Sequence, residues 1–362
     1  MVAAHERADW RAIVAAALRA PWADNRPALR FEWRDGALEW LLTDTQDDLP
    51  HRRWLALVAC GAALENARLR AASLGLQLVH ATAADPARPA FVARSRIALP
   101  LERAAADLEL AAQIERRCTN RRFYRRDRLM PAAESAIAAA AGPSWTWLSG
   151  AARRRALTAL RLAEAERFRR PRLHQELFEA IRFDVGWSAT TTHGLPPGAL
   201  EIERALRRPF AWLRHPRVMS VLTAFGVPAA LGLRAADLPC RLAPRLAMIV
   251  DESESDADDE RGRALAAGRA LQRGWLAAAA NGVAMQPLAA VGALLRQRAG
   301  GGWVSAGTQQ RLRELLAETS SSGAPKAVHL FVRLGYARPP TVVTSRADVD
   351  SALRGEWQRQ RE

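Results

Sequence analysis

The pattern of hydrophobic and polar positions predicts a chain in which helices and strands alternate. Near the N-terminus, residues 8–19 have the spacing of an amphipathic helix and lead into the turn-rich stretch Pro21–Pro27. Two strand-like runs, Leu29–Trp33 and Ala37–Leu42, then flank Arg34-Asp35-Gly36. A short run of this composition between two strands predicts a β-hairpin.

The same order of elements recurs further along the chain. Ala132–Ala141 is helix-like and leads through Gly142-Pro143 into a short strand, Trp145–Leu148. Other strand-like runs are Phe91–Leu99, Leu246–Val250 and Val328–Leu334. This mixture predicts an α+β protein whose sheets are enclosed by helices.

Residues 59–75 and 266–282 form an internal repeat in which eight of the seventeen positions are identical without gaps. Four of the eight are alanines in an alanine-rich chain, so the shared spacing of two glycines and two leucines is the more specific part. Both segments read as helices that end at a glycine. The repeat predicts two related halves whose central helices pack around a pseudo-twofold axis. The alternative is that any two helices rich in Ala and Leu look alike.

On this basis we expect the first half to span residues 1–106 and the second half residues 107–362. The second half is longer, because an extra stretch lies at about residues 164–242 and includes His193–Leu200. Long additions to a compact fold are commonly lids or binding loops. We therefore expect this insertion to cover a site.

Composition and charge narrow the classes of partner. The net charge is +15, but Lys326 is the only lysine, and the arginines are scattered among acidic residues. Because the positive charge is not concentrated on one segment, this distribution argues against a nucleic-acid partner. No apolar run reaches the ~18 residues of a membrane span. The sequence therefore predicts a cytoplasmic protein with no membrane partner.

Several common catalytic signatures are missing. The sequence has no GxxxxGK, HExxH, GxSxG or GxGxxG motif. Its seven histidines are dispersed, and its three cysteines, Cys60, Cys118 and Cys240, are far apart. We therefore expect no metal site, no structural disulfides and no hydrolase machinery.

One short motif is chemically specific: Arg117, Thr119 and Arg121 occupy alternate positions after a predicted helix. Alternate residues of an extended strand point to one side, so two guanidinium groups and a hydroxyl could converge on one anion. Arginine suits a phosphate monoester because it forms bidentate, charge-assisted hydrogen bonds. The alternative, in a chain so rich in arginine, is an exposed basic strand.

Five motifs in a fixed order give the chain a resemblance to a known family. They are Ala20-Pro21-x-x-x-Asn25, Cys60-Gly61-Ala62-Ala63-Leu64-x-Asn66, Arg117-x-Thr119-Asn120-Arg121, Gly268-Arg269-Ala270-Leu271-Gln272-Arg273 followed by Asn281-Gly282 and Gln286-Pro287, and Arg333-Leu334-Gly335-Tyr336-Ala337. In order and spacing they resemble the nitroreductase family, and specifically its Acg-like, FMN-binding branch. The resemblance runs over residues 8–346 and is weakest in the insertion.

The resemblance implies a single-chain pseudo-dimer with FMN in the cleft between its two halves. It implies that Arg117, Thr119 and Arg121 hold the FMN phosphate, joined by Arg346. It places Asn25 at the flavin ring or ribityl chain. The segment Met285, Gln286, Pro287 and Leu288 would lie along the isoalloxazine edge.

The chain also departs from the family pattern near this site. Trp22 stands where the family usually has serine, and Arg26-Pro27-Ala28-Leu29 replaces Gln-Pro-Trp. Trp187, Trp212 and Trp275 are candidates for stacking on a flavin, although tryptophans at helical spacing are more often core or lid residues.

The function that follows is an FMN-dependent oxidoreductase. Electrons from NAD(P)H or an organic donor would pass through the flavin to a nitroaromatic, a quinone or a similar acceptor. No residue is predicted as a proton donor. Alternatives are a protein that binds or sequesters flavin without turnover and, third, an arginine-rich nucleic-acid binder. The chain would act as a monomeric pseudo-dimer or as a homodimer.

Overall fold

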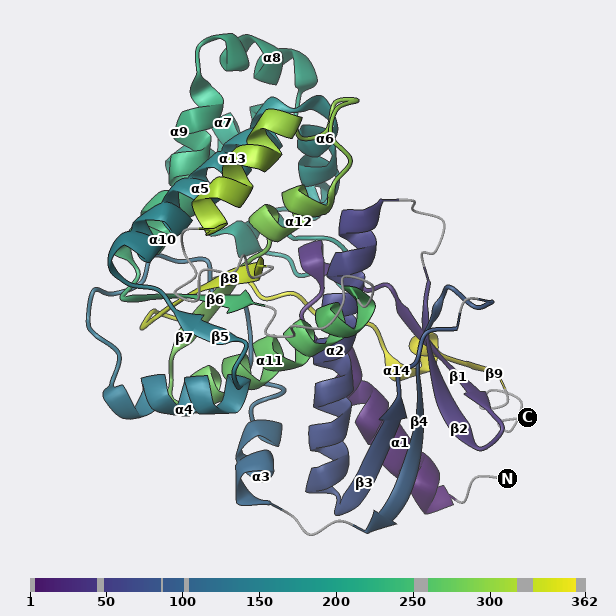
Figure 1. Ribbon diagram of the computed structural model, residues 1–362. Coiled ribbons are helices and arrows are strands. Elements are labelled where there is room, and N and C mark those ends of the chain that lie inside the picture. The colour runs from purple at the N-terminus through teal and green to yellow at the C-terminus, as the bar shows by residue number, and fades with distance from the viewer. Residues whose placement is uncertain are drawn as a thin grey trace.

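The computed structural model describes residues 4–43, 49–85, 87–100, 104–250, 260–317 and 328–355. Two separate β-sheets are each covered by helices, and a further group of helices forms one end of the molecule (Figure 1). The predicted α+β class is confirmed.

The first sheet contains the N-terminal strands in the order β3-β4-β2-β1-β9. Its strands are β1 (Leu29–Arg34), β2 (Ala37–Leu42), β3 (Leu76–Ala81), β4 (Phe91–Pro100) and β9 (Leu353–Gly355). The predicted hairpin joins β1 and β2, with Asp35 and Gly36 at positive φ of 49° and 68°. Both central residues of this type of tight turn need positive φ, which suits Asp-Gly. Along β1 buried residues alternate with more exposed ones, as expected when one face of a strand is covered.

The second sheet has the strand order β5-β6-β8-β7. Its strands are β5 (Trp145–Trp147), β6 (Arg245–Val250), β7 (Ala284–Leu288) and β8 (Val328–Gly335). Four strands of the first sheet run in the corresponding order, β1-β2-β4-β3. In each sheet the second strand leads through one long helix to the strand at the far edge. The two sheets therefore share strand order and connection.

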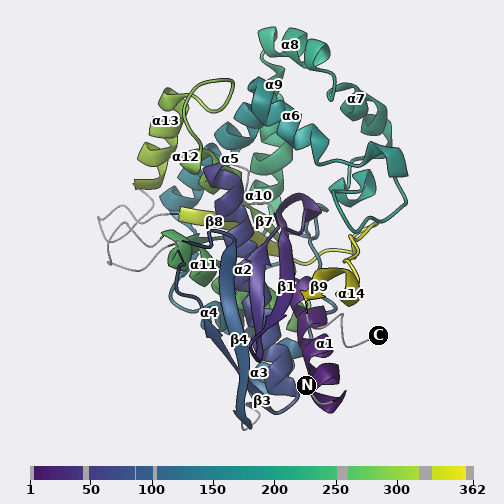
Figure 2. The same ribbon diagram turned by 90° about the vertical axis from the view of Figure 1, so that its right-hand side faces the viewer.

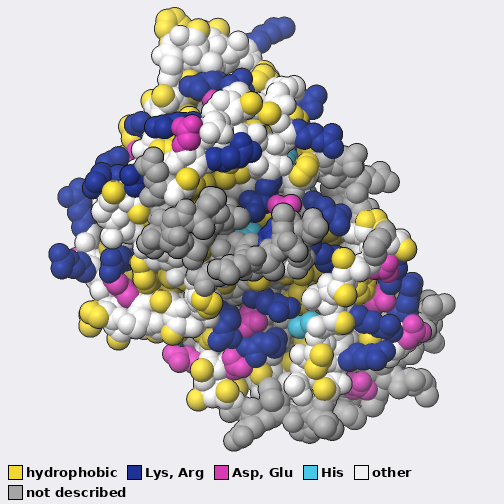
Figure 3. All heavy atoms as spheres, in the orientation of Figure 1, with side chains coloured by type: hydrophobic (Ala, Val, Ile, Leu, Met, Phe, Trp, Pro, Cys, Tyr) yellow, Lys and Arg dark blue, Asp and Glu magenta, His cyan; other side chains and the backbone are white. Residues whose placement is uncertain are grey.

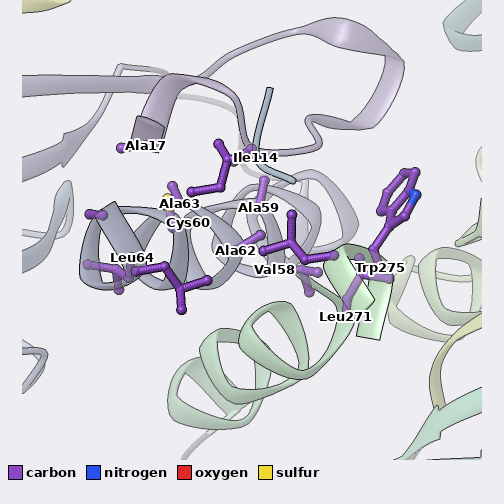
Figure 4. Packing of buried hydrophobic residues seen from close by; sticks show 14 of the residues in the cluster. Ala17, Val58, Ala59, Cys60, Ala62, Ala63, Leu64, Ile114, Leu271 and Trp275 are labelled. Carbon is purple, nitrogen blue, oxygen red and sulfur yellow. The ribbon is translucent and has the colours of Figure 1, made fainter. Parts of the chain in front are cut away.

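These two long helices, α2 (Pro50–Ser73) and α11 (Glu260–Ala280), cross at the centre of the molecule (Figures 1 and 4). Glycines allow the close approach. A Cβ at Gly61 would lie 2.0 Å from the carbonyl oxygen of Leu265, and a Cβ at Gly268 would lie 1.9 Å from that of Val58. Gly61 and Gly268 are equivalent positions of the sequence repeat, so each helix accommodates the other in the same way.

Shorter helices complete the two sheet regions. They are α1 (Ala4–Leu18), α3 (Ala105–Ala111), α4 (Pro131–Ala141) and α14 (Val349–Ala352). The boundary predicted at residues 106 and 107 falls within α3 and stays a prediction. The chain returns to the first sheet at its end, where β9 pairs in parallel with β1.

A helical region lies between β5 and β6 in sequence and at one end of the molecule in space (Figures 1 and 2). It comprises α5 (Gly150–Arg169), α6 (Pro171–Glu179), α7 (Arg207–Trp212), α8 (Pro216–Ala224), α9 (Val227–Gly232) and α10 (Leu238–Leu242), with short helical turns at Phe183–Val185, Pro197–Leu200, Arg204–Leu206 and Leu233–Asp237. Helices α12 (Ala290–Arg296) and α13 (Ala306–Ala317) join it from between β7 and β8. It contains the insertion predicted at about residues 164–242.

Within the described ranges, no single helix has the length and apolar character to cross a membrane. One pair of helical segments, Pro216–Ala224 and Val227–Leu242, passes this test of length and composition together, but the chain bends by 100° between them.

Candidate functional site

The segment that carries the arginine motif runs between α3 and α4. The sequence predicts an extended strand here, and this expectation is wrong: only an isolated bridge between Thr119 and Met285 forms. The Asn120 N–H also donates to the Met285 carbonyl oxygen over 3.1 Å. This single attachment to the edge strand β7 nevertheless directs the side chains of the motif toward one pocket.

The first pocket is built from four segments that are distant in sequence. Asn25, Arg117, Thr119, Arg121 and Arg346, which are five of the nine predicted site residues, all line it. The other lining residues are Arg19, Pro21, Trp22, Cys118, Leu195, Ala199, Val342 and Thr344. The three arginines among the predicted site residues therefore meet in this pocket.

These three arginines are buried or half-buried and have no anionic partner. Arg117 is 7% exposed, and its guanidinium donates to the Arg19 carbonyl oxygen over 2.6 Å. Arg121 donates to the Ala199 carbonyl over 3.2 Å. Arg346 donates to the Asn25 side-chain oxygen over 2.7 Å and otherwise to a hydroxyl and backbone carbonyls. Across the described ranges, none of the three pairs with a carboxylate.

Burial of these unpaired charges lowers the pKa of their guanidinium groups. Burial, reinforced by the charge of Arg346, lowers the pKa of Arg117 to about 9. Burial and the nearby Arg19 lower the pKa of Arg346 to about 10. The Nε atoms of Arg117 and Arg346 are buried without hydrogen-bond acceptors. A buried charge without a partner is costly, so this arrangement fits a pocket that receives an anion.

Asn25 fixes one wall of this pocket. Its backbone is in the left-handed region with φ of 52°, a conformation that asparagine tolerates better than most residues. Its amide nitrogen donates to the carbonyls of Thr191 and Gly194, each over 3.1 Å, while its side-chain oxygen accepts from Arg346. The polar atoms of Asn25 therefore join the N-terminal turn, the insertion and the C-terminal segment.

A second, larger pocket adjoins the first and shares Pro21, Trp22, Thr119, Arg121 and Leu195 with it. Its cavity volume is about 270 Å³, close to the lower end of the ~300–1,000 Å³ that is typical of small-molecule pockets. One wall is apolar and comes from the crossing helices, with Val58 and Ala59 on α2 and Leu271 and Trp275 on α11. Figure 4 shows these residues around the crossing.

The β7 segment forms another wall of the second pocket. The predicted residues Gln286, Pro287 and Leu288 line it, and the Gln286 side-chain oxygen accepts from Arg333 over 2.7 Å. Met285, also predicted, is fully buried in the hydrophobic core and lines neither pocket. Met285 therefore approaches the site only through its backbone, whose carbonyl oxygen accepts the Asn120 N–H.

The third wall comes from the insertion, which the sequence predicts to cover a site without indicating which of its residues do so. Leu173, Glu176 and Leu177 on α6 line the second pocket, as do Glu164 and Arg167 on α5. The pair Glu164–Arg167 lies one helical turn apart with a separation of 3.2 Å. No motif marked these residues, because their role depends on where the insertion packs.

An ion-pair cluster attaches α6 to the start of α2. The Glu176 carboxylate lies 3.1 Å from His51 Nε2 and 2.6 Å from Arg52 Nε. Burial raises the pKa of Glu176, but the hydrogen bonds from His51 and Arg52 outweigh it and lower the value to about 2. His51 is 2% exposed and also lines the second pocket.

The three tryptophans considered for stacking lie in different environments. Trp275 is buried at the second pocket, with the Arg117 guanidinium 4.5 Å from its ring centroid. Trp187 lies beneath Arg207 at 4.7 Å and lines neither pocket. Trp212 is 65% exposed. Trp22, which replaces the small family residue, is buried and lines both pockets.

Among the described residues, no group of three or more His, Cys, Asp or Glu side chains is placed to hold a metal ion.

No protein-family model and no curated protein sequence matches this chain. Among solved structures, the chain is similar to the FMN-dependent nitroreductase NfnB from Mycobacterium smegmatis in complex with NADPH. The identity is 21%, the match covers 68% of this chain and 98% of that one, and the TM-score is 0.35. A likeness of this strength carries no argument about the fold or activity of this chain.

Proposed function

We propose that this chain is an FMN-binding oxidoreductase of the nitroreductase type, in which two halves of one polypeptide stand in for two subunits. The observation that carries the proposal is the first pocket, where three arginines without anionic partners converge beside a second pocket that has an apolar wall. A flavin mononucleotide combines a phosphate monoester with a flat, largely apolar ring, and therefore has the two chemistries that these adjoining pockets accept.

Reciprocal contacts between α2 and α11 support the pseudo-twofold relation of the halves. Beyond the two glycines, Gln272 donates to the Asn66 side chain over 2.6 Å, and Arg273 donates to Glu65 over 2.8 Å. In the repeat, Glu65 corresponds to Gln272 and Asn66 to Arg273. The two hydrogen-bonded pairs are thus equivalent positions exchanged across the crossing, as a twofold axis requires.

The residues present fit the phosphate end of FMN. Arg117, Thr119, Arg121 and Arg346 would hold the phosphate, and the acceptor-less Nε atoms of Arg117 and Arg346 mark unused donor capacity there. Guanidinium groups bind phosphate oxygens through short, charge-assisted hydrogen bonds. Asn25 would act mainly by positioning Arg346, because the structure already engages its amide group within the protein.

The second pocket would hold the flavin ring and, beside it, the substrate. Gln286, Pro287 and Leu288 would border the ring, with Trp22 and Trp275 as aromatic neighbours. When bound, FMN supplies the hydride- and electron-transfer chemistry, and the protein supplies position and exclusion of water. NAD(P)H or an organic donor, and a nitroaromatic or quinone acceptor, are the substrate classes proposed.

One observation favours a second candidate function, the sequestering of flavin without turnover. Residues of the insertion form a wall of the second pocket, and the Gly194 N–H donates to the Asn25 carbonyl over 2.8 Å. If this wall closes the ring face completely, a nicotinamide cannot approach it. The insertion would then be a cover rather than a substrate-binding element.

Two measurements on the purified full chain test these proposals. The first is the visible spectrum before and after incubation with FMN, where a flavin band that stays with the protein through desalting is expected. Protein that takes up no FMN contradicts both candidates. The second is steady-state oxidation of NADH and NADPH with menadione or a nitrofuran as acceptor. Turnover supports the oxidoreductase, and bound flavin without turnover supports sequestering.

A further inference from the structure

Helix α8 has apolar side chains on two faces, but only one face is covered. Met219 is 3% exposed and packs with Leu222 in the small cluster around Phe178. On the other side, Val221 is 60% exposed and Phe225, directly after the helix, is 80% exposed. Positions 218, 221 and 225 are spaced three and four residues apart, and therefore share one stripe of the helix surface.

Basic residues are frequent in the sequence on both sides of this uncovered stripe. Residues 204–236 include six arginines and neither aspartate nor glutamate. Arg208 and Arg217 are exposed, and neither side chain has a hydrogen bond or ion pair with another residue in the described part of the chain. Trp212, 65% exposed, ends α7 just before α8. The region therefore combines exposed apolar groups, a surface tryptophan and unpaired positive charge.

The position of α8 makes these side chains accessible to a large, flat partner. The helix lies at the extreme end of the molecule, far from both sheets (Figures 1 and 2). At that end, Figure 3 shows hydrophobic side chains with a basic side chain beside them. A protruding tip does not enclose a small ligand, but it can press against an extended surface.

We infer that the α7–α8 tip, defined as Trp212, Val218, Val221 and Phe225 with Arg208 and Arg217, docks on the surface of an anionic phospholipid bilayer. Val and Phe side chains would enter the interfacial zone, where tryptophan is also favoured, and the arginines would lie among the headgroup phosphates. The expectation of no membrane partner rests on the lack of a membrane-spanning segment in the sequence. Docking on the surface of a bilayer is a different mode of contact and needs no such segment. The inference does not depend on FMN binding.

Charge argues against two other occupants. A second copy of the chain would bring two α7–α8 tips together, each carrying the unpaired charges of Arg208 and Arg217 and no acidic residue within residues 204–236. A nucleic acid would satisfy the arginines but would leave the exposed valines and phenylalanine without apolar contact. An anionic bilayer offers negative charge to the arginines and apolar contact to the exposed valines and phenylalanine.

The test is co-sedimentation of the full chain with vesicles of phosphatidylcholine, with or without phosphatidylglycerol. The wild type is expected to sediment with the anionic vesicles and to remain in solution with the neutral ones. The double variant Val221→Ser/Phe225→Ser keeps every charge and is expected to bind about tenfold or more weakly, because each buried apolar side chain adds to binding. The double variant Arg208→Gln/Arg217→Gln keeps the apolar face and is expected to lose the preference for anionic vesicles.

Matched variants elsewhere on the surface provide the controls. Met130→Ser removes an apolar side chain that is 64% exposed, and Arg126→Gln/Arg128→Gln removes two exposed charges. Both are expected to bind like the wild type, with circular dichroism confirming that every variant is folded. The inference is overturned if the wild type does not bind, or if Val221→Ser/Phe225→Ser binds unchanged, which indicates attraction by charge alone. Self-association without vesicles that this same variant abolishes would identify a second copy as the occupant and also overturn it.

Discussion

At the scale of single residues, Arg117 is a buried charge without a counter-charge, which costs the ligand-free protein stability. Arg117 is 7% exposed, and its guanidinium has a carbonyl and an aromatic ring as neighbours and a pKa lowered to about 9 by burial. An anion that enters the pocket would supply the missing counter-charge. Arg117 would then stabilise the bound state more than the free one.

Replacement of this charge should separate binding from folding. In Arg117→Met we expect the flavin-free protein to be as stable as the wild type or more stable, because a buried, unpaired charge is removed. FMN affinity should fall about 10- to 100-fold, since a hydrogen bond to a charged group contributes about 1.5–3 kcal/mol. Thermal unfolding without ligand and fluorescence titration with FMN measure the two effects.

Arg126→Met is the matched control, because Arg126 is exposed and lies outside both pockets. It should change neither the melting temperature nor the affinity. Lower stability of Arg117→Met with unchanged FMN affinity would show that Arg117 is a structural residue and would remove the main support for a phosphate site.

At the scale of elements, the crossing of α2 and α11 is the most constrained contact in the molecule. Gly61 and Gly268 each face a backbone carbonyl of the opposite helix at a distance that no side chain allows. A Cβ added at either glycine would clash with backbone atoms, which cannot move aside as a flexible side chain can. The two helices would therefore have to separate.

We therefore expect Gly61→Ala and Gly268→Ala each to reduce the free energy of unfolding by about 1–3 kcal/mol or more, the usual cost of overpacking. Chemical denaturation measures this cost. Gly307→Ala is the control, because Gly307 lies on α13 with no atom within 4 Å of the added Cβ. It should be neutral or slightly stabilising, since alanine is the better helix former. Equal stability of all three variants would contradict the close crossing.

The attachment of α6 to α2 by Glu176 leads to a prediction about pH. The pKa of Glu176 in the folded protein is lowered to about 2 from an ordinary value of 4.5. A carboxylate with a depressed pKa stabilises the fold fully above its unfolded-state pKa, and this contribution is lost as the pH falls toward the folded-state value. The contribution of Glu176 should therefore be complete above about pH 4.5 and decline between about pH 4.5 and pH 2.

Comparison of Glu176→Gln with the wild type tests this directly. The variant should melt at a lower temperature at neutral pH, and the difference should shrink steadily below about pH 4.5. Glu179→Gln, one turn further along α6 and exposed, should follow the wild type at every pH. A difference that stays constant down to pH 2 would show that the Glu176 charge does not hold the two helices together.

At the scale of the whole molecule, equivalent strand orders in the two sheets coexist with an asymmetric site. The arginine-lined pocket draws on residues 19–25, on residues 117–121, on the insertion and on the C-terminal segment near Arg346. The C-terminal segment then continues to β9, which pairs with β1 of the first sheet. The repeat at residues 59–75 and 266–282 includes none of these contributors.

This asymmetry predicts one FMN per chain rather than the two that equivalent halves would give. A titration followed by protein fluorescence should saturate at one equivalent, and denaturation of the loaded protein should release the same amount. The chain's mass in solution, measured by light scattering, fixes the reference for this ratio. Two equivalents per chain would show that a second pocket of the same kind exists.

Much of the fold and part of the site could be read from local sequence. The β1–β2 hairpin, α4 and the glycine-spaced central helices depend on periodicity and turn residues within short windows. The anion-binding residue types in Arg117, Thr119 and Arg121 were also recognisable, although the strand expected to align them is only one bridge. Residue chemistry thus predicted the pocket better than local geometry did.

What the sequence by itself determined was which segments form most of the helices and strands, which two helices are alike, and which side chains are candidates for holding a phosphate. Only the tertiary structure decided that Asn25 meets Arg346, 321 residues away, and that Glu176 reaches His51, 125 residues away. It also decided that Met285 faces the core and that one apolar face of α8 stays uncovered. The physical reason is that local preferences act over a few residues, whereas the partners of a side chain are set by the packing of the whole chain.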